Sequence, residues 1–191
     1  RRHIKDHDVI DVKKNINIPL QLEIAPTEFM FNFVIENNIK KVCIVPEKRK
    51  ELTTEGGLNI KSNFNFLKNN IPRLIENNAE VSLFLDPEEK SVELSLELGI
   101  QAIEFHTGEF ANADKFHEKT LLDNFSSVVN YAKSKGVSVR AGHGLNYAKV
   151  KKIIKISGIE ELNIGHFIIG ESIFYGLSTV VKKMKNIIKE G

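Results

Sequence analysis

Six short apolar segments alternate along the chain with longer stretches of helical periodicity, and this alternation constrains the fold more than any other feature. Strands that alternate with helices are typical of right-handed βαβ units, which build a parallel sheet. The segments are nearly continuous apolar runs, as expected for strands buried on both faces. The predicted strands cover residues 18–25, 41–46, 80–86, 102–108, 137–144 and 161–166. Helices are predicted at 27–38, 62–78, 87–98 and 147–156, and in two long stretches that end at Lys135 and Glu190.

Four of the strand segments end in residues that a buried strand does not favour. They read LQLEIA (20–25), AIEFHTG (102–108), VSVRAGHG (137–144) and ELNIGH (161–166). In a closed parallel barrel the carboxyl ends of the strands converge on one mouth, where catalysis takes place. No GxGxxG motif follows the first strand, which disfavours a doubly wound dinucleotide-binding sheet. The sequence therefore predicts an α/β fold of the TIM (β/α)8 barrel type.

The length of the chain bears on how much of such a barrel is present. A TIM barrel takes roughly 250 residues, whereas six strand–helix units are predicted in these 191 residues. We expect the first two βα units to be absent from the sequence and to precede Arg1. Residues 1–191 are then one barrel domain that is incomplete at its N-terminus.

The composition excludes several classes of protein. The net charge is only +2, and the Lys residues alternate with Asp and Glu along helical stretches, which is typical of a solvated surface and not of nucleic-acid binding. No signal peptide or membrane-spanning stretch is recognisable, so a cytoplasmic protein that does not enter membranes is expected. The single Cys43 lies in the apolar segment KVCIVP and is interpreted as a small buried hydrophobic residue.

Two carboxylates lie within predicted strands. Glu23 is flanked by apolar residues in LEIA, and Glu104 occupies a similar place in AIEFHTG. A carboxylate there is costly unless it is paired or used. One interpretation is a structural ion pair inside the barrel. The other is a general base whose pKa is raised by partial desolvation.

Two histidines follow predicted strands next to glycine. His143 lies between Gly142 and Gly144, which let the backbone approach a ligand closely and expose the imidazole for proton transfer. His166 follows Gly165, where the last strand gives way to a helix. The loops after the last two strands of such barrels commonly bind phosphate with the help of a helix N-terminus.

A metal centre is an alternative explanation for histidines at strand ends. His106, His143 and His166 all lie there, but no HxH or HExxH pattern is present and no carboxylate is diagnostically spaced. We therefore expect no metal site. The role of His106, as a site residue or as a packing residue, stays open. No Lys lies at the carboxyl end of a predicted strand, which disfavours a Schiff-base mechanism.

Several blocks of sequence together resemble one known family. They are VPEKRKELTTEGGL (45–58), EFHTG (104–108), AGHGLNY (141–147) and ELNIGHFIIG (161–170), with weaker support from LEIAPTEFM (22–30) and the opening RRHI. The blocks follow the family's order along the whole chain. On these blocks the sequence resembles the pyridoxine 5′-phosphate synthases of the deoxyxylulose-dependent vitamin B6 pathway.

The resemblance implies a TIM barrel that condenses 3-amino-2-oxopropyl phosphate with 1-deoxy-D-xylulose 5-phosphate, yielding pyridoxine 5′-phosphate, phosphate and water. It implies a homo-octamer that uses neither a metal nor an organic cofactor. Carried over by motif, Glu23 is a catalytic proton acceptor, His143 is the proton donor, and Glu104 stabilises the transition state.

The same resemblance implies the substrate contacts. Gly144, Gly165 and His166 match contacts to the aminoketone phosphate, and His3 and Thr53 match contacts to deoxyxylulose phosphate. The family also carries an Asn, an Asp-His pair, an Arg and a further catalytic His in earlier positions. This chain has no match for them, which agrees with the two units expected before Arg1.

Two other functions remain open on the sequence alone. Another phosphosugar barrel, such as an isomerase or epimerase, would use a similar Glu base but needs one phosphate site instead of two. A non-catalytic barrel that binds a phosphometabolite would not depend on Glu23 and His143.

Overall fold

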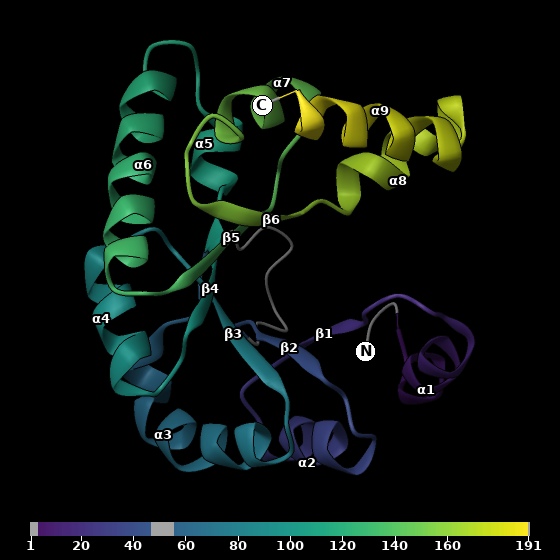
Figure 1. The fold of residues 1–191 in the computed structure, drawn as a ribbon, viewed down its shortest axis with the longest axis vertical. Helices are drawn as coiled ribbons and strands as arrows, with labels where there is room; N and C mark the ends of the chain where they lie inside the picture. Colours follow the sequence, from purple (N-terminus) through teal and green to yellow (C-terminus); the bar gives the residue numbers. More distant parts are fainter. Residues whose placement is uncertain (1–3, 47–55, 191) are drawn as a thin grey trace.

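The computed structural model describes residues 4–46 and 56–190, and its centre is one parallel sheet. The strands follow one another in the sheet in chain order. The sheet curls so that helices cover its outer side and its inner side faces an opening (Figure 1). The six strands are β1 (Gln21–Ile24), β2 (Lys41–Ile44), β3 (Glu80–Leu85), β4 (Ala102–His106), β5 (Ser138–Gly142) and β6 (Ile159–Asn163).

All six predicted strands are present and parallel. Five lie within their predicted ranges, whereas β6 begins two residues before its predicted range and ends three residues before its predicted end. The helices between them agree with the prediction except in two places. Those that match are α2 (Glu28–Glu36), α3 (Ile60–Glu76), α4 (Glu89–Glu97) and α7 (Tyr147–Ile153), and α1 (Asp6–Asn15) precedes the first strand.

The two long helices of the prediction are each divided. The first consists of α5 (Gly108–Asn112) and α6 (Glu118–Ser134). Asp114 lies between them, and its Oδ1 accepts the backbone N–H groups of Phe116 and His117 at 2.9 Å, which caps the turn that leads into α6. The terminal helix consists of α8 (His166–Tyr175) and α9 (Leu177–Lys189), and the break falls at Gly176, whose φ is +77°.

Four helices end in the same type of C-terminal cap, and a strand follows each of them. Each of α2, α3, α4 and α6 ends at an Asn or Gly in the left-handed conformation, and the next residue donates its N–H to a carbonyl five positions earlier. This next residue is apolar and buried, so the helix end is fixed to the core. The left-handed residues are Asn38, Asn78, Gly99 and Gly136, followed by Ile39, Ala79, Ile100 and Val137.

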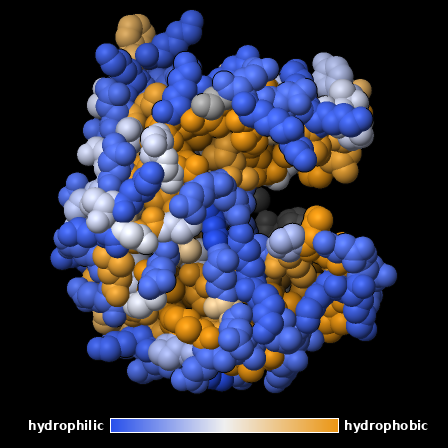
Figure 2. Space-filling model, viewed as in Figure 1, coloured by the Kyte–Doolittle hydropathy of each residue, from blue (hydrophilic) through white to orange (hydrophobic). Residues whose placement is uncertain are grey.

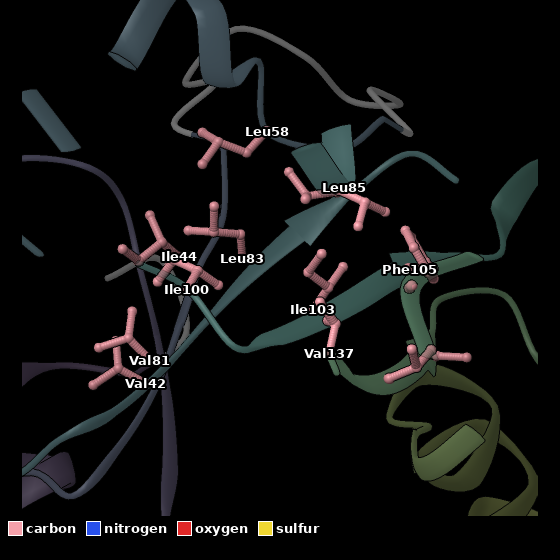
Figure 3. Close-up of a cluster of buried hydrophobic side chains, with 14 of the residues drawn as sticks. Val42, Ile44, Leu58, Val81, Leu83, Leu85, Ile100, Ile103, Phe105 and Val137 are labelled. Atoms are coloured by element: carbon pink, nitrogen blue, oxygen red, sulfur yellow. The ribbon is translucent and has the colours of Figure 1, made fainter. Parts of the chain in front are cut away.

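The hydrophobic core lies between the outer face of the sheet and the helices (Figure 3). Alternate residues of the strands point to this side and are almost completely buried. They pack on the apolar faces of α3, α4 and α6, through residues such as Leu67, Val92 and Val129. The strand residues on this face include Val42, Ile44, Val81, Leu83, Leu85, Ile103 and Phe105.

The inner face of the sheet is polar, which the nearly continuous apolar runs did not predict, although central strands such as β4 and β5 are buried on both faces as expected. Arg140 projects from β5 on this side, and its guanidinium forms ion pairs with Glu80 and Glu161. Lys41 also binds Glu161, at 2.5 Å. Arg140 is only 5% exposed and further donates to Gln21 and Ser82. The sequence pattern was misread because these charges alternate with strongly apolar residues.

The sheet is open within the described residues, with β1 and β6 at its two edges. Hydrophobic residues gather along the opening, beneath the region of α8 and α9 (Figure 2). Helix α8 has no buried residue despite its apolar sequence. The large exposed side chains there are Ile169, Ile173, Phe174, Tyr175 and Leu177. The structure is therefore a curled half-barrel.

Candidate active site

Three of the predicted site residues lie on, or directly after, strands of the one parallel sheet. Glu23 is the third residue of β1, Glu104 is the third residue of β4, and His143 directly follows β5. Glu23 and Glu104 both point to the inner face, and the charge of Glu23 acts on Glu104. The two carboxylates therefore share one face of the sheet.

Glu104 is the most perturbed carboxyl group of this face. It is 3% exposed, and burial raises its pKa to about 7, with a smaller upward contribution from the charge of Glu23. A hydrogen bond from Asn163 Nδ2 to Glu104 Oε2, at 2.5 Å, works in the opposite direction. Glu104 can therefore both give and take a proton near neutral pH.

Cys43 lies beside the same carboxylate. It pairs with Glu23 in the register of β1 and β2, and its Sγ donates to Glu104 Oε2 across 3.7 Å. Burial and the charge of Glu104 raise the pKa of Cys43 above its usual range, so it remains a thiol. The expectation of a buried Cys is confirmed, but its contact with a carboxylate was not foreseen.

Glu23 differs from Glu104 in its surroundings. Its side chain is exposed at the edge strand β1, within the part of the chain that the structure describes. The upward pKa shift that the sequence suggested for a strand carboxylate is found at Glu104.

His143 is held in an unusual backbone conformation after β5. Its φ is +82°, and the imidazole is exposed. Thr107 fixes this turn, since its hydroxyl donates to the carbonyls of Gly142 and His143 at 2.8 and 2.6 Å. The neighbouring Gly144 also has positive φ, and a Cβ there would collide with Ala111. The fold therefore requires glycine at 144 irrespective of any ligand.

His106 forms a pair with Asp86 next to His143. Its Nδ1 lies 3.2 Å from Asp86 Oδ1, and its ring centroid lies 4.8 Å from that of His143. The side chain is 6% exposed, and Nε2 has no hydrogen-bond partner among the described residues. Asp86 Oδ1 also accepts the N–H of Gly57 at 2.8 Å. His106 is thus part of the site region, and Asp86 is a partner that the sequence signalled only as the end of a strand.

Gly165 and His166 lie at the junction of β6 and α8. His166 is the first residue of α8, Gly165 precedes it, and both are exposed. The N–H groups of a helix start are suited to bind an anion. His3 and Thr53, the two remaining predicted contacts, lie outside the described residues.

Two further observations concern the described ranges 4–46 and 56–190. No group of three or more His, Cys, Asp or Glu side chains is arranged there to hold a metal ion. None of the helices in these ranges combines the length and the apolar character needed to cross a bilayer.

A parallel, curled β/α sheet with titratable groups at the carboxyl ends of its strands defines a barrel-type enzyme. Comparison with solved structures agrees on the fold. The tryptophan synthase α-subunit of Pyrococcus furiosus, a TIM barrel, superimposes with a TM-score of 0.61 at 14% identity, over 96% of this chain and 72% of its own. A xylose isomerase domain protein from Planctomyces limnophilus gives 0.54 at 11% identity, over 88% and 71%.

Sequence comparison identifies the family. The family model described as "Pyridoxal phosphate biosynthesis protein PdxJ" matches residues 1–190. Proteins named pyridoxine 5′-phosphate synthase are 48% identical in Sulfurihydrogenibium sp. (strain YO3AOP1) and 45% identical in Coxiella burnetii (strain Dugway 5J108-111). Each alignment covers 98% of this chain and 79% of the relative. The chain therefore belongs to the PdxJ family.

Proposed function

We propose that this chain catalyses the pyridoxine 5′-phosphate synthase reaction, in which 3-amino-2-oxopropyl phosphate and 1-deoxy-D-xylulose 5-phosphate condense. Family membership supports the reaction. The observation that carries a role for this face of the sheet is Glu104, a buried carboxyl group with a pKa of about 7 beside a second carboxylate. Such a group can exchange protons at neutral pH.

The chemistry fits this set of groups. Joining an amine to a ketone, losing water and closing an aromatic ring require repeated proton transfer between carbon and oxygen. In our proposal Glu23 accepts protons, His143 donates them, and Glu104 stabilises the transition state. The placement of Glu23 and Glu104 on the inner face, with His143 directly after β5, supports this.

The two substrate phosphates act as handles that position the reacting carbons. We propose Gly144, Gly165 and His166 as contacts of the aminoketone phosphate, and His3 and Thr53 as contacts of the deoxyxylulose phosphate. The exposed start of α8 supports the first site, because its N–H groups suit a dianion. No metal or organic cofactor takes part in the proposed reaction.

We further propose that the working protein is a closed (β/α)8 barrel in the cytoplasm. Two additional βα units would pair with the edges at β1 and β6 and would cover the apolar residues of α8. The relatives support this, since this chain covers 79% of the first two. The proposed assembly is a homo-octamer, and sedimentation of the full-length protein would test it.

The roles of Glu23 and His143 are tested by Glu23→Gln and His143→Asn in the full-length protein. Each should lower turnover by about 10²–10⁴-fold while the protein stays folded, because each removes a proton carrier and keeps the shape of the side chain. Glu97→Gln and His7→Asn, two exposed helical positions, are the matched controls. Near-normal turnover in both site variants would refute the assignment.

A further inference from the structure

We propose that Asn163 is the positioning residue of Glu104, and that with Cys43 it holds Glu104 Oε2 so that Oε1 is the oxygen that exchanges the proton. This inference rests on the proposed function, since it specifies how one of its carboxyl groups is held. It adds a role for the last residue of β6, which belongs to the ELNIGH motif but is not among the predicted site residues.

Two donors converge on the same oxygen. Asn163 Nδ2 lies 2.5 Å from Glu104 Oε2, and Cys43 Sγ lies 3.7 Å from it. They come from opposite sides of β4, since Cys43 is on β2 and Asn163 is on β6. An amide nitrogen can only donate, and a protonated thiol is a weak donor. Oε2 is therefore an acceptor in both protonation states of the acid.

These two donors also determine which oxygen carries the proton when Glu104 is neutral. A protonated carboxyl group has one carbonyl oxygen and one hydroxyl. Because Oε2 receives two donors, it takes the carbonyl role, and the proton lies on Oε1. Without this constraint, the two oxygens would be equivalent and the proton could point in either direction.

Oε1 in turn faces the backbone next to His143. It lies against Gly142, where a side-chain carbon would overlap it. Gly142 is the last residue of β5 and the residue before His143. Because Gly142 has no side chain, there is room for the carboxyl group of Glu104. Oε1 therefore lies on the side of the turn that carries His143, the proposed proton donor.

The ionisable groups around Glu104 come from several strands. Glu23 on β1 and Glu161 on β6 both disfavour its ionised form, as does burial. The donors Asn163 and Cys43 favour the ionised form, with Asn163 the stronger of the two. Arg140 is the neighbour of Glu104 in the register of β4 and β5, but its guanidinium is engaged by Glu80 and Glu161.

The test is infrared spectroscopy of the carboxyl C=O stretch in the full-length protein, titrated from pH 5 to 9. Subtracting the spectrum of Glu104→Gln isolates the band of Glu104. In Asn163→Leu the lost donor should move the C=O band to higher frequency. It should also raise the titration midpoint by about 1–2 pH units, because the carboxylate loses a short hydrogen bond.

Two further variants separate positioning from general damage. Cys43→Ala should raise the midpoint by less than Asn163→Leu does, and Cys43→Ser, which keeps a donor, should not raise it. If Asn163→Leu fails to fold, Asn163→Ala replaces it and should show the same direction of change. A band and midpoint that are unchanged in either folded Asn163 variant would overturn the proposal.

Kinetics gives a readout that a purely structural residue would not affect. The pH profile of kcat in Asn163→Leu should shift upward together with the infrared midpoint, while KM for both substrates changes little. A fall in kcat with no shift of the profile would contradict the inference. If Glu104→Gln turns over normally, the proposed role of Glu104 fails, whereas the infrared titration still decides whether Asn163 positions it.

Discussion

The charged groups at the two ends of the inner face have different partners. Toward the amino ends of the strands, the cations Lys41 and Arg140 are paired with Glu80 and Glu161. Toward the carboxyl ends, the carboxyl group of Glu104 has hydrogen-bond donors and a like-charged neighbour, but no cation contacts it within the described residues.

With the proposed roles, the ion pairs of the inner face contribute to stability and Glu104, on the same face, contributes to chemistry. The ion pairs toward the amino ends join β2 to β6, β3 to β5 and β5 to β6 across the inner face. A carboxylate that is buried without a cation titrates near neutrality instead. In barrels, the amino-terminal face contributes mainly to stability and the carboxyl-terminal face to catalysis. We propose the same division for this half-barrel.

The largest expected effect concerns the pH dependence of stability. Glu104 has a pKa of about 7 against an ordinary value of 4.5. The neutral acid is the form that folding favours, so its contribution is fully present below pH 4.5 and is lost as the pH rises through 7. At about 1.4 kcal/mol per pH unit, this corresponds to roughly 3 kcal/mol.

Glu104→Gln should remove this dependence. Denaturant unfolding at pH 4.5 and pH 8 would compare the two proteins, with the variant about equal to the parent at the lower pH and more stable at the higher. Equal stability of both proteins at pH 8 would show that the buried carboxyl group carries no penalty, and the contrast between the two ends would disappear.

The next largest effect is a loss of stability toward the amino ends of the strands, where the ion pairs lie. Glu161→Gln removes the carboxylate that Lys41 and Arg140 share, and should lower the free energy of unfolding by about 3 kcal/mol. This is the low end of the range for breaking a buried pair, since Glu161 is 34% exposed. Lys90→Ala at the exposed Lys90–Glu93 pair, measured by the same unfolding titration, should change stability by less than about 0.5 kcal/mol.

A smaller loss of stability is expected at Gly142, where the Glu104 carboxyl group lies against the backbone. Gly142→Ala places a methyl group against Glu104 Oε1 and should cost about 2 kcal/mol through overpacking. Gly99→Ala is a useful comparison, because its strain comes from positive φ alone and nothing lies within 4 Å of the added carbon. If Gly142→Ala also moves the titration of Glu104 while Gly99→Ala does not, the close approach is specific to the site.

Much of the fold was predictable because the sequence repeats one local design. Apolar runs of strand length and a left-handed Asn or Gly after four of the helices fix the order of elements. The breaks at Asp114 and Gly176 were missed because the apolar periodicity continues across both, and only the cap at Asp114 and the positive φ at Gly176 reveal them. The polar inner face was missed because Arg140 and Glu161 pair only after the sheet forms.

The site was predictable to the level of residue types at strand ends. Glu104 and His143 could be selected because Glu and His stand out in apolar segments. The links between strands could not be predicted, since Asn163 meets Glu104 across 59 positions of sequence and Asp86 meets His106 across 20. Neither pairing has a spacing signature, because it depends on strand register and on the curl of the sheet.

The central claim is that charges at the carboxyl ends serve chemistry and those at the amino ends serve stability. Measuring turnover and the free energy of unfolding together in Glu23→Gln and Glu161→Gln tests it most directly. The account predicts that Glu23→Gln loses at least 100-fold in turnover and no stability, because a charge that opposes the ionisation of Glu104 is removed. A Glu23→Gln protein that is destabilised as much as Glu161→Gln, with turnover retained, would contradict it.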